Sequence, residues 1–175
     1  ASDGKGLPGL EWSKEIPPGG FLMGQDGGPE GSGPSTHINV EYSFWVSKYH
    51  ITNKQFSEFL NLAHVTKHIN SSGQIIDFNA PLSKVSSVPN RNWRLISLGD
   101  TSPIRWNVNK FELNNKENHA ALVTPAGAIA FAAWYGYDIP RKWEWEKAAR
   151  GLDDDAGEHK VYTWGNNVSA NYIEK

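Results

Sequence analysis

The stretch from residue 123 to residue 151 constrains the fold of this chain more than any other, because it carries the start and stop signals of two helices. Thr124 is a residue type that caps a helix, and Pro125 suits the first helical position. The apolar residues that follow predict a helix that packs into a core. A second helix, over residues 143–150, would end at Gly151, which tolerates the positive φ of a C-terminal cap. We therefore expect two short helices joined by a tight corner.

The same stretch resembles the central signature of the formylglycine-generating enzyme family, whose domain is also called the sulfatase-modifying-factor domain. That signature usually reads V-S-W-x-D-A-x-A-Y-C-x-W and then G-x-R-L-P-T-E-x-E-W-E-x-A-A-R-G. Here the letters are V-T-P-A-G-A-I-A-F-A-A-W and G-Y-D-I-P-R-K-W-E-W-E-K-A-A-R-G. Three further blocks agree in order and spacing: IPPGGFLMG at residues 16–24, FWVSKYHITNKQFSEFL at residues 44–60, and YTWGN at residues 162–166. The resemblance covers nearly all of this chain but only the first part of the family's domain.

Composition limits the classes of function. At 175 residues the chain suits one domain with a sizeable core. A net charge of −2 supplies no basic field that would gather nucleic acid or an anionic membrane. No apolar run of about 18 residues is present, so we expect no membrane span. The sequence contains no cysteine, which excludes disulfides, thiolate metal sites and cysteine nucleophiles within these residues.

The rest of the chain shows shorter signals. Residues 1–15 read as an N-terminal arm with Trp12 as its large anchor, and residues 16–175 as the domain. We expect a strand over residues 16–24, a loop over 25–36, an alternating strand over 37–49 and a capped amphipathic helix over 52–62. Residues 64–120 form a long insertion, with a hairpin near Ser72 and short strands over 91–98 and 103–108.

The resemblance implies an α+β, C-type-lectin-like fold with short strands, a few short helices and extensive loops. The pattern of elements agrees with that class. In the family the domain continues into a catalytic region that has no counterpart here. An incomplete domain would expose strand edges and part of its core. We therefore expect a second polypeptide that completes the domain, with this chain as a proteolytic fragment that ends at Lys175.

Metal sites have both a functional and an ordinary interpretation. His64 and His68 have helical i, i+4 spacing, but the helix should end near them, so we favour surface histidines. The acidic run over residues 153–158 lacks the alternating spacing of a calcium loop, so we favour a solvated turn. The resemblance implies a structural calcium site to which Asn171 and Tyr172 would contribute half of the ligands.

Eight tryptophans suggest either a large aromatic core or a ligand-facing surface, since indole rings serve both roles. We expect Trp134, Trp145 and Trp164 in the core. We expect Trp93, Trp106 and Trp143 to contact a protein or carbohydrate ligand. The triplets that begin at Asn70 and Asn167 fit the glycosylation pattern, which is short and commonly fortuitous.

The resemblance implies an oxidoreductase that converts a sulfatase cysteine to formylglycine with oxygen and copper. Its copper-binding cysteines belong to the late part of the domain, and the family's earlier cysteine position holds Ala132. Copper would therefore bind only if a cysteine-bearing C-terminal part exists. No histidine set matches the related iron-dependent sulfoxide synthases. We name no catalytic residue in this chain.

Other relatives of this domain serve as binding proteins. Arg141, Lys142, Pro125 and Gly127 depart from the family signature, which indicates a divergent member. We predict a ligand-binding or accessory module that is secreted or periplasmic. The alternative is part of an oxidoreductase that is completed by residues beyond 175.

Overall fold

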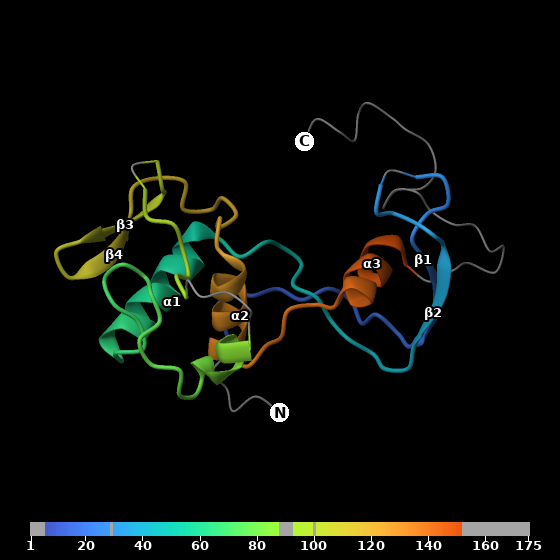
Figure 1. The fold of residues 1–175 in the computed structure, drawn as a ribbon, viewed down its shortest axis with the longest axis horizontal. Coiled ribbons are helices and arrows are strands. Elements are labelled where there is room, and N and C mark those ends of the chain that lie inside the picture. The colour runs from blue at the N-terminus through green and yellow to red at the C-terminus, as the bar shows by residue number, and fades with distance from the viewer. Residues whose placement is uncertain (1–5, 29, 88–92, 100, 152–175) are drawn as a thin grey trace. The chain divides into compact units, whose positions relative to one another are not determined.

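The computed structural model describes residues 6–28, 30–87, 93–99 and 101–151, and these residues form two units (Figure 1). Unit 1 consists of Ala1–Glu11 and Tyr49–Ile139, and unit 2 consists of Trp12–Lys48 and Pro140–Lys175. Both units are built from two separate stretches of chain. The chain therefore passes between them three times.

Unit 1 contains the helix α1, Asn53–Val65, whose start the sequence predicts correctly. The backbone N–H of Gln55 donates to Thr52 Oγ1 at 3.2 Å, and the N–H of Thr52 donates to Gln55 Oε1 at 2.9 Å. Two backbone donors that the helix cannot satisfy are paired in this way. The helix runs three residues beyond the predicted end at Leu62.

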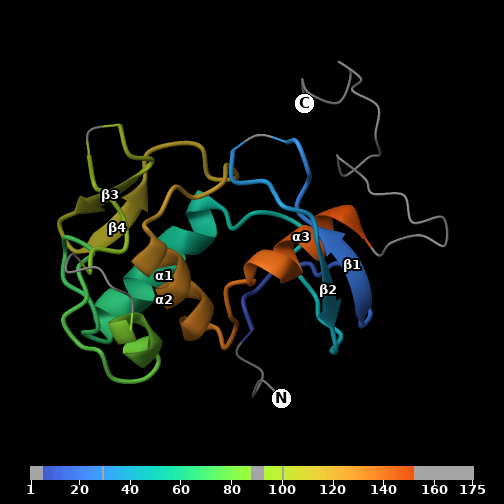
Figure 2. The ribbon, with the colours of Figure 1, turned by 45° about the vertical axis from the view of Figure 1, so that its right-hand side comes forward.

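The second helix of unit 1 is α2, Pro125–Trp134, which also begins where the sequence predicts. It lies beside α1 in both ribbon views (Figure 2), and aromatic side chains join the two helices. The ring of Phe131 stacks on Phe56 at 5.6 Å between centroids and meets Phe59 edge-on at 5.4 Å. The core of unit 1 forms around these rings. Each such aromatic pair contributes roughly 0.5–1.5 kcal/mol beyond its buried area.

Gly127 allows α2 to pack closely against the backbone at Leu95. A Cβ atom at this position would overlap the backbone oxygen of Leu95. Thr124 fixes the same approach, because its Oγ1 accepts from the Gly127 N–H at 3.0 Å and donates to the Arg94 oxygen at 2.7 Å. A glycine in place of the aspartate of the family signature thus has a packing reason in this chain.

The long insertion contributes a 3-10 helix and a hairpin to unit 1. The 3-10 helix η1 spans Leu82–Ser87, and the strands β3, Ile104–Asn107, and β4, Lys110–Leu113, pair antiparallel. The predicted strand over 103–108 and the predicted turn near Ser72 are confirmed, the latter by the bridge between Ile69 and Ile75. The predicted strand over 91–98 is wrong for its described residues, which form only one bridge, between Gln74 and Arg94.

Unit 2 contains an antiparallel pair of strands, β1, Gly19–Met23, and β2, Thr36–Val40. Gly19 lies opposite Val40, and Met23 lies opposite Thr36. The prediction of one strand over residues 37–49 is wrong beyond Val40. The chain continues there with two isolated bridges, from Phe44 to Ile16 and from Ser47 to Trp12. These bridges hold the segment after β2 beside residues 12–16 without a continuous strand ladder, although its apolar residues still alternate in the sequence.

The helix α3, Lys142–Arg150, belongs to unit 2, whereas α2 belongs to unit 1. Three side chains of the signature bind α3 to residues at the ends of the strands and next to them. Lys147 is fully buried, and its Nζ donates to the backbone oxygens of Pro17 at 2.8 Å and Gly19 at 2.9 Å. Glu146 accepts from the N–H of Gly24 at 2.6 Å. The third, Glu144, accepts from the Tyr42 hydroxyl at 2.6 Å.

The segment predicted as an N-terminal arm also contributes to packing. Leu7 is buried in the core of unit 1, and its N–H donates to the Tyr137 hydroxyl at 3.2 Å. Trp12, the predicted anchor, is 43% exposed. The buried side chain that holds this segment is therefore Leu7.

Candidate functional site

The two predicted ligand-binding tryptophans of unit 1 lie half-buried against its core. Trp93 meets Phe78 edge-on at 5.1 Å between ring centroids. Trp106 projects from β3 and meets Phe111 edge-on at 5.0 Å, while the ring of His64 lies 4.6 Å from it. Each indole has its own aromatic neighbours and keeps one part open to solvent.

Trp143, the third predicted ligand-binding tryptophan, lies half-buried in α3 of unit 2. Its Nε1 donates to the Tyr42 hydroxyl at 3.4 Å, and the Arg141 guanidinium lies 5.4 Å from its ring. Trp145 was predicted to be a core residue, and this is wrong: the side chain is 65% exposed. Lys147 lies on the buried side of α3. Residues two apart in a helix lie on different sides, so Trp145 does not share that buried side.

The predicted metal ligands cannot be placed. Asn171 and Tyr172, together with the acidic run over residues 153–158, lie outside the described residues. Trp164 and the triplet that begins at Asn167 lie outside them too. Within the described ranges there is no group of three His, Asp or Glu side chains that could hold a metal ion.

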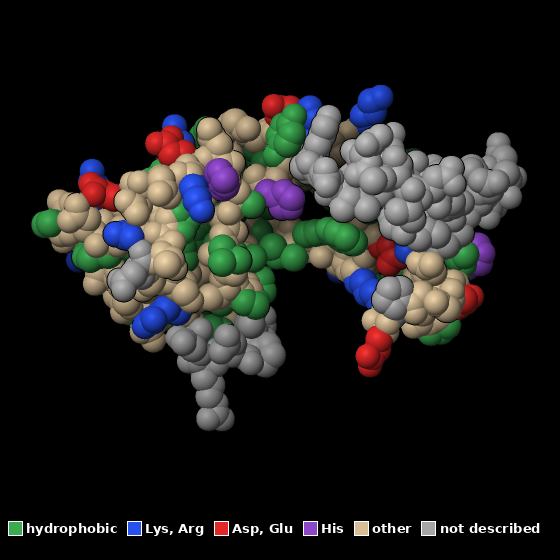
Figure 3. Space-filling view, turned by 90° about the horizontal axis from the view of Figure 1, so that it is seen from above, with side chains coloured by type: hydrophobic (Ala, Val, Ile, Leu, Met, Phe, Trp, Pro, Cys, Tyr) green, Lys and Arg blue, Asp and Glu red, His purple; other side chains and the backbone are tan. Residues whose placement is uncertain are grey.

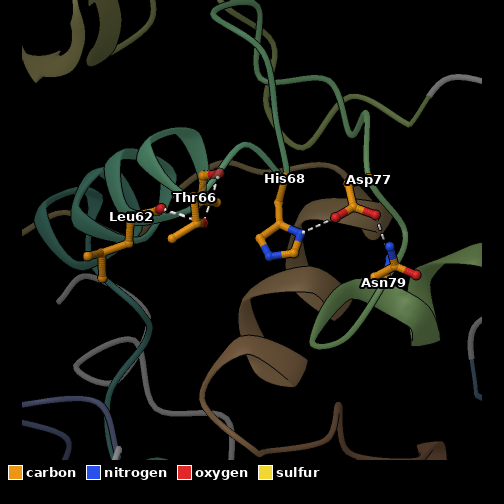
Figure 4. Close-up of polar contacts among 6 residues, drawn as sticks. Leu62, Thr66, His68, Asp77 and Asn79 are labelled. Carbon is orange, nitrogen blue, oxygen red and sulfur yellow. Dashed lines mark hydrogen bonds and ion pairs between the residues drawn. The ribbon is translucent and has the colours of Figure 1, made fainter.

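His64 and His68 do not form a pair. His64 lies in α1 against Trp106, whereas His68 follows the helix and lies 3.3 Å from Asp77, measured from Nδ1 to Oδ2 (Figure 4). The side chain of His68 is only 14% exposed, so the prediction of a surface histidine is wrong for this residue. Asp77 also accepts from the N–H of Asn79 at 3.0 Å.

Unit 1 contains a hollow of about 360 Å³ with many polar lining residues, which we call the Tyr49 hollow. Its lining side chains with hydrogen-bonding groups are Glu11, Tyr49, His50, Thr52, Gln55 and Asn118. One wall is the segment that leads into α1, and the facing wall is the segment near Asn118. The bridge between Thr52 and Ala120 and a 2.9 Å bond from the Asn53 N–H to the His119 oxygen hold these walls together.

The chemistry of the Tyr49 hollow is mixed. The Tyr49 side chain is 60% exposed, so its ring presents an apolar face to solvent. Around it lie one carboxylate, one imidazole and amide groups, which offer both donors and acceptors. Sequence reasoning missed this hollow, because its walls come from three separated stretches and no local motif joins them.

A second hollow of about 310 Å³ in unit 1 has an apolar lining with an ion pair at its rim. Ile129, Ala132 and Ile139 line it, and Lys84 Nζ lies 2.7 Å from Asp138 Oδ1. The two charged side chains are 59% and 81% exposed, so this pair contributes little to stability. Ala132 stands at the family's cysteine position, so this wall offers a methyl group instead of a thiol.

Charged side chains of both signs are interspersed on the face that Figure 3 draws, with no large patch of one sign. Among the described residues, no helix has the length and apolar character needed to cross a membrane. Both observations concern only the part of the chain that the structure describes.

Comparisons with known proteins agree with the signature. Residues 13–174 match the family described as the sulfatase-modifying factor enzyme 1-like domain. The chain is 33% identical over 172 residues to inactive C-alpha-formylglycine-generating enzyme 2 of Mus musculus, and the aligned region covers 89% of this chain and 51% of that protein. It is 29% identical over 167 residues to the formylglycine-generating enzyme of Thermomonospora curvata, where the aligned region covers 88% of this chain and 52% of that protein.

The chain thus spans about half the length of the curated relatives it matches. In the described ranges, the short strands, three α-helices and long loops agree with the predicted fold class. The family match extends over almost the whole sequence. The chain belongs to the sulfatase-modifying factor enzyme 1-like domain family, the family of the formylglycine-generating enzymes.

Proposed function

We propose that this chain acts as a ligand-binding or accessory module of its family and that these residues carry no catalytic group of their own. The observation that carries the proposal is the Tyr49 hollow, in which an exposed aromatic ring stands among hydrogen-bonding side chains. The sequence contains no cysteine, so it cannot supply a thiolate for copper or for nucleophilic attack. Similarity to a relative whose name calls it inactive supports the same conclusion.

The hollow suits a neutral polar ligand. A flat aromatic face binds the apolar side of a sugar ring or of a peptide side chain, while amide and imidazole groups select its polar atoms. Asn118 and His50 form no hydrogen bond with their side chains in the described structure and remain available to a ligand. A carbohydrate or a protein segment is therefore the ligand class that we propose.

The three tryptophans extend this proposal. Trp93, Trp106 and Trp143 keep part of their rings open, and each would add apolar contact to a bound ligand. Asn171 and Tyr172 would provide half of a structural calcium site, and the other ligands would come from residues beyond this chain. We propose export to an extracellular or periplasmic compartment, where millimolar calcium could occupy such a weak site.

The binding proposal is tested with saturation-transfer NMR on the full chain, with neutral mono- and disaccharides and a panel of short peptides as probes. We expect Tyr49→Ala to weaken binding at least tenfold, because the stacking face is lost, which corresponds to about 1.4 kcal/mol. Tyr49→Phe keeps the ring and should bind within a few-fold of the natural chain. Equal binding by the natural chain and Tyr49→Ala would show that the ligand does not bind at this hollow.

The alternative function is the first part of an oxidoreductase that further residues complete. The length of the relatives favours it, because this chain spans about half of each. A second polypeptide or a continuation that carries cysteines would then bring copper. Intact mass under native and denaturing conditions identifies a bound second chain. Oxygen-dependent formation of an aldehyde on a cysteine-containing sulfatase peptide would establish catalysis, and its absence in the completed protein would exclude it.

A further inference from the structure

The turn that begins at Asn70 has a geometry that the proposed functions do not use. The Asn70 Oδ1 accepts three hydrogen bonds, from the Ser72 hydroxyl at 2.7 Å, from the Ser72 N–H at 3.0 Å and from the Gln74 N–H at 3.1 Å. The backbone closes the same turn, since the Gly73 N–H donates to the Asn70 oxygen at 2.9 Å. Asn70 therefore organises the turn entirely through its oxygen atoms and its backbone N–H, which donates to Gln74.

The other side-chain atom of Asn70, the amide nitrogen Nδ2, has no protein partner in the described structure. Among the described residues, it is also not one of the buried side-chain atoms that lack a hydrogen bond. Nδ2 therefore reaches solvent. Ser71 beside it is exposed as well. A group attached to Nδ2 would leave all three bonds to Oδ1 intact.

We propose that Asn70 is a site of N-linked glycosylation when the chain passes through a secretory pathway that attaches such glycans. The donor class is an oligosaccharide on a lipid pyrophosphate, and a transferase supplies the base. The Nδ2–H bond breaks and its proton goes to the base, a bond forms from Nδ2 to the anomeric carbon, and the lipid pyrophosphate leaves with the bonding electron pair. No oxidant or reductant takes part.

The three donors around Oδ1 favour this reaction. As Nδ2 loses its proton and attacks, negative charge develops on the amide oxygen, and donors that already point at that oxygen stabilise it. The Ser72 hydroxyl is one of them, which gives a physical role to the third residue of the Asn70-Ser71-Ser72 triplet. All of these bonds join residues at most four apart. The reactive turn can therefore form before the domain folds.

Two variants separate the modification from the structure of the turn. Asn70→Asp removes the acceptor nitrogen but keeps an oxygen for the same three donors, and bonds to a carboxylate are at least as strong. We therefore expect it to lose the glycan and keep its thermal unfolding midpoint. Ser72→Ala removes one donor and leaves both backbone N–H bonds, so it should fold and lose most of the modification.

The experiment is secretion of the full chain, with a signal peptide, from a eukaryotic cell line. Glycans are removed with an amidase in heavy-oxygen water, which labels each occupied asparagine and distinguishes it from spontaneous deamidation. Trypsin places Asn70 in the peptide from residue 68 to residue 84 and Asn167 in the peptide from residue 161 to residue 175, so the two triplets are scored separately.

We expect the label at Asn70 in the natural chain and its loss in both variants. Secreted chain in which Asn70 is unlabelled would overturn the proposal, and so would a label that persists in Ser72→Ala at the natural level. The inference rests on the proposed export and not on the Tyr49 hollow. Ligand binding measured on the same secreted chain distinguishes failure of the glycosylation proposal from failure of the proposed binding function.

Discussion

Val108 adopts a backbone conformation that β-branched residues rarely take. It lies between β3 and β4 with φ of 52°, and the Asn109 N–H donates to the Asn107 oxygen across it at 2.5 Å. Such a three-residue turn is strained, and the left-handed conformation costs an L-residue roughly 1–2 kcal/mol. The side chain is 88% exposed, so little packing offsets this cost.

We expect Val108→Gly to raise the free energy of unfolding by about 0.5–1 kcal/mol, because relief of strain exceeds the entropy cost of a glycine. The measurement is a urea titration followed by tryptophan fluorescence. Val65→Gly is the matched control, since Val65 is 77% exposed, is the last residue of α1 and does not have a positive φ. That control should lower stability. Destabilisation by both changes would contradict the strain argument.

At the scale of single elements, α3 has an incomplete N-terminal cap. Glu144 accepts from the Arg141 N–H at 2.7 Å, which is one half of a capping box. The other half requires an oxygen on residue 141, and a guanidinium has none. The family's threonine at this position would provide it. The departure of Arg141 from the family signature therefore leaves α3 without this side-chain acceptor.

We expect Arg141→Thr to stabilise α3 by about 0.5–1.5 kcal/mol, reduced by the loss of the contact with Trp143. Slower amide exchange in α3 would show it. Thr124→Ala, which removes the observed cap of α2, should produce a change of similar size and opposite sign in α2. Unchanged exchange in α3 would mean that the strands, rather than the cap, determine its stability.

The burial of Lys147 makes the stability of the packing between α3 and β1 depend on pH. Burial lowers the pKa of Lys147 below its ordinary value of 10.5. Between the lowered pKa and 10.5 the unfolded chain binds more protons than the folded chain, so stability rises with pH in that window. Below the lowered pKa the cost of the buried charge is fully present.

We expect the urea midpoint of unit 2 to rise as pH increases toward 10.5, and we expect Lys147→Met to abolish this rise. The variant should also lose about 1–3 kcal/mol for each carbonyl left without a donor, at Pro17 and Gly19. A rise with pH that persists in Lys147→Met would assign it to another group.

The sequence predicts helices that have local capping signals, but it does not predict which side chains are exposed or which residues line the hollows. Thr52 and Gln55 specify the start of α1 within four residues, and Thr124 does the same for α2. The exposure of Trp145 depends on which side of α3 the strands cover, and nine residues do not reveal that. The contact of His68 with Asp77 joins residues from a stretch without periodicity. The Tyr49 hollow requires the tertiary structure.

At the scale of the whole molecule, the two units differ in the amount of buried apolar surface. Most of the buried side chains belong to unit 1, whereas the described part of unit 2 buries Phe21, Val40 and Lys147. A two-stranded sheet by itself is marginally stable, so β1 and β2 depend on the helix α3 that packs against them. From this difference in burial among the described residues, we expect unit 2 to be the less stable unit.

We expect amides of β1 and β2 to exchange with solvent deuterium faster than those of α1 and α2, since local opening follows the number of buried contacts. Mass spectrometry of peptic peptides measures this directly. Addition of a completing polypeptide, where one exists, should slow exchange in unit 2 more than in unit 1. Equal protection of both units would show that they unfold together.

The burial of Leu7 matters for anyone who chooses where to begin this domain. The family match starts at residue 13, and all the recognisable blocks lie after it. A version trimmed to that boundary would retain every residue of the family blocks but would lack Leu7, which is part of the core. The Tyr137 hydroxyl would also lose the hydrogen bond that it accepts from the Leu7 N–H. We therefore expect that a stably folded chain must begin before residue 13, where the region that identifies the family starts.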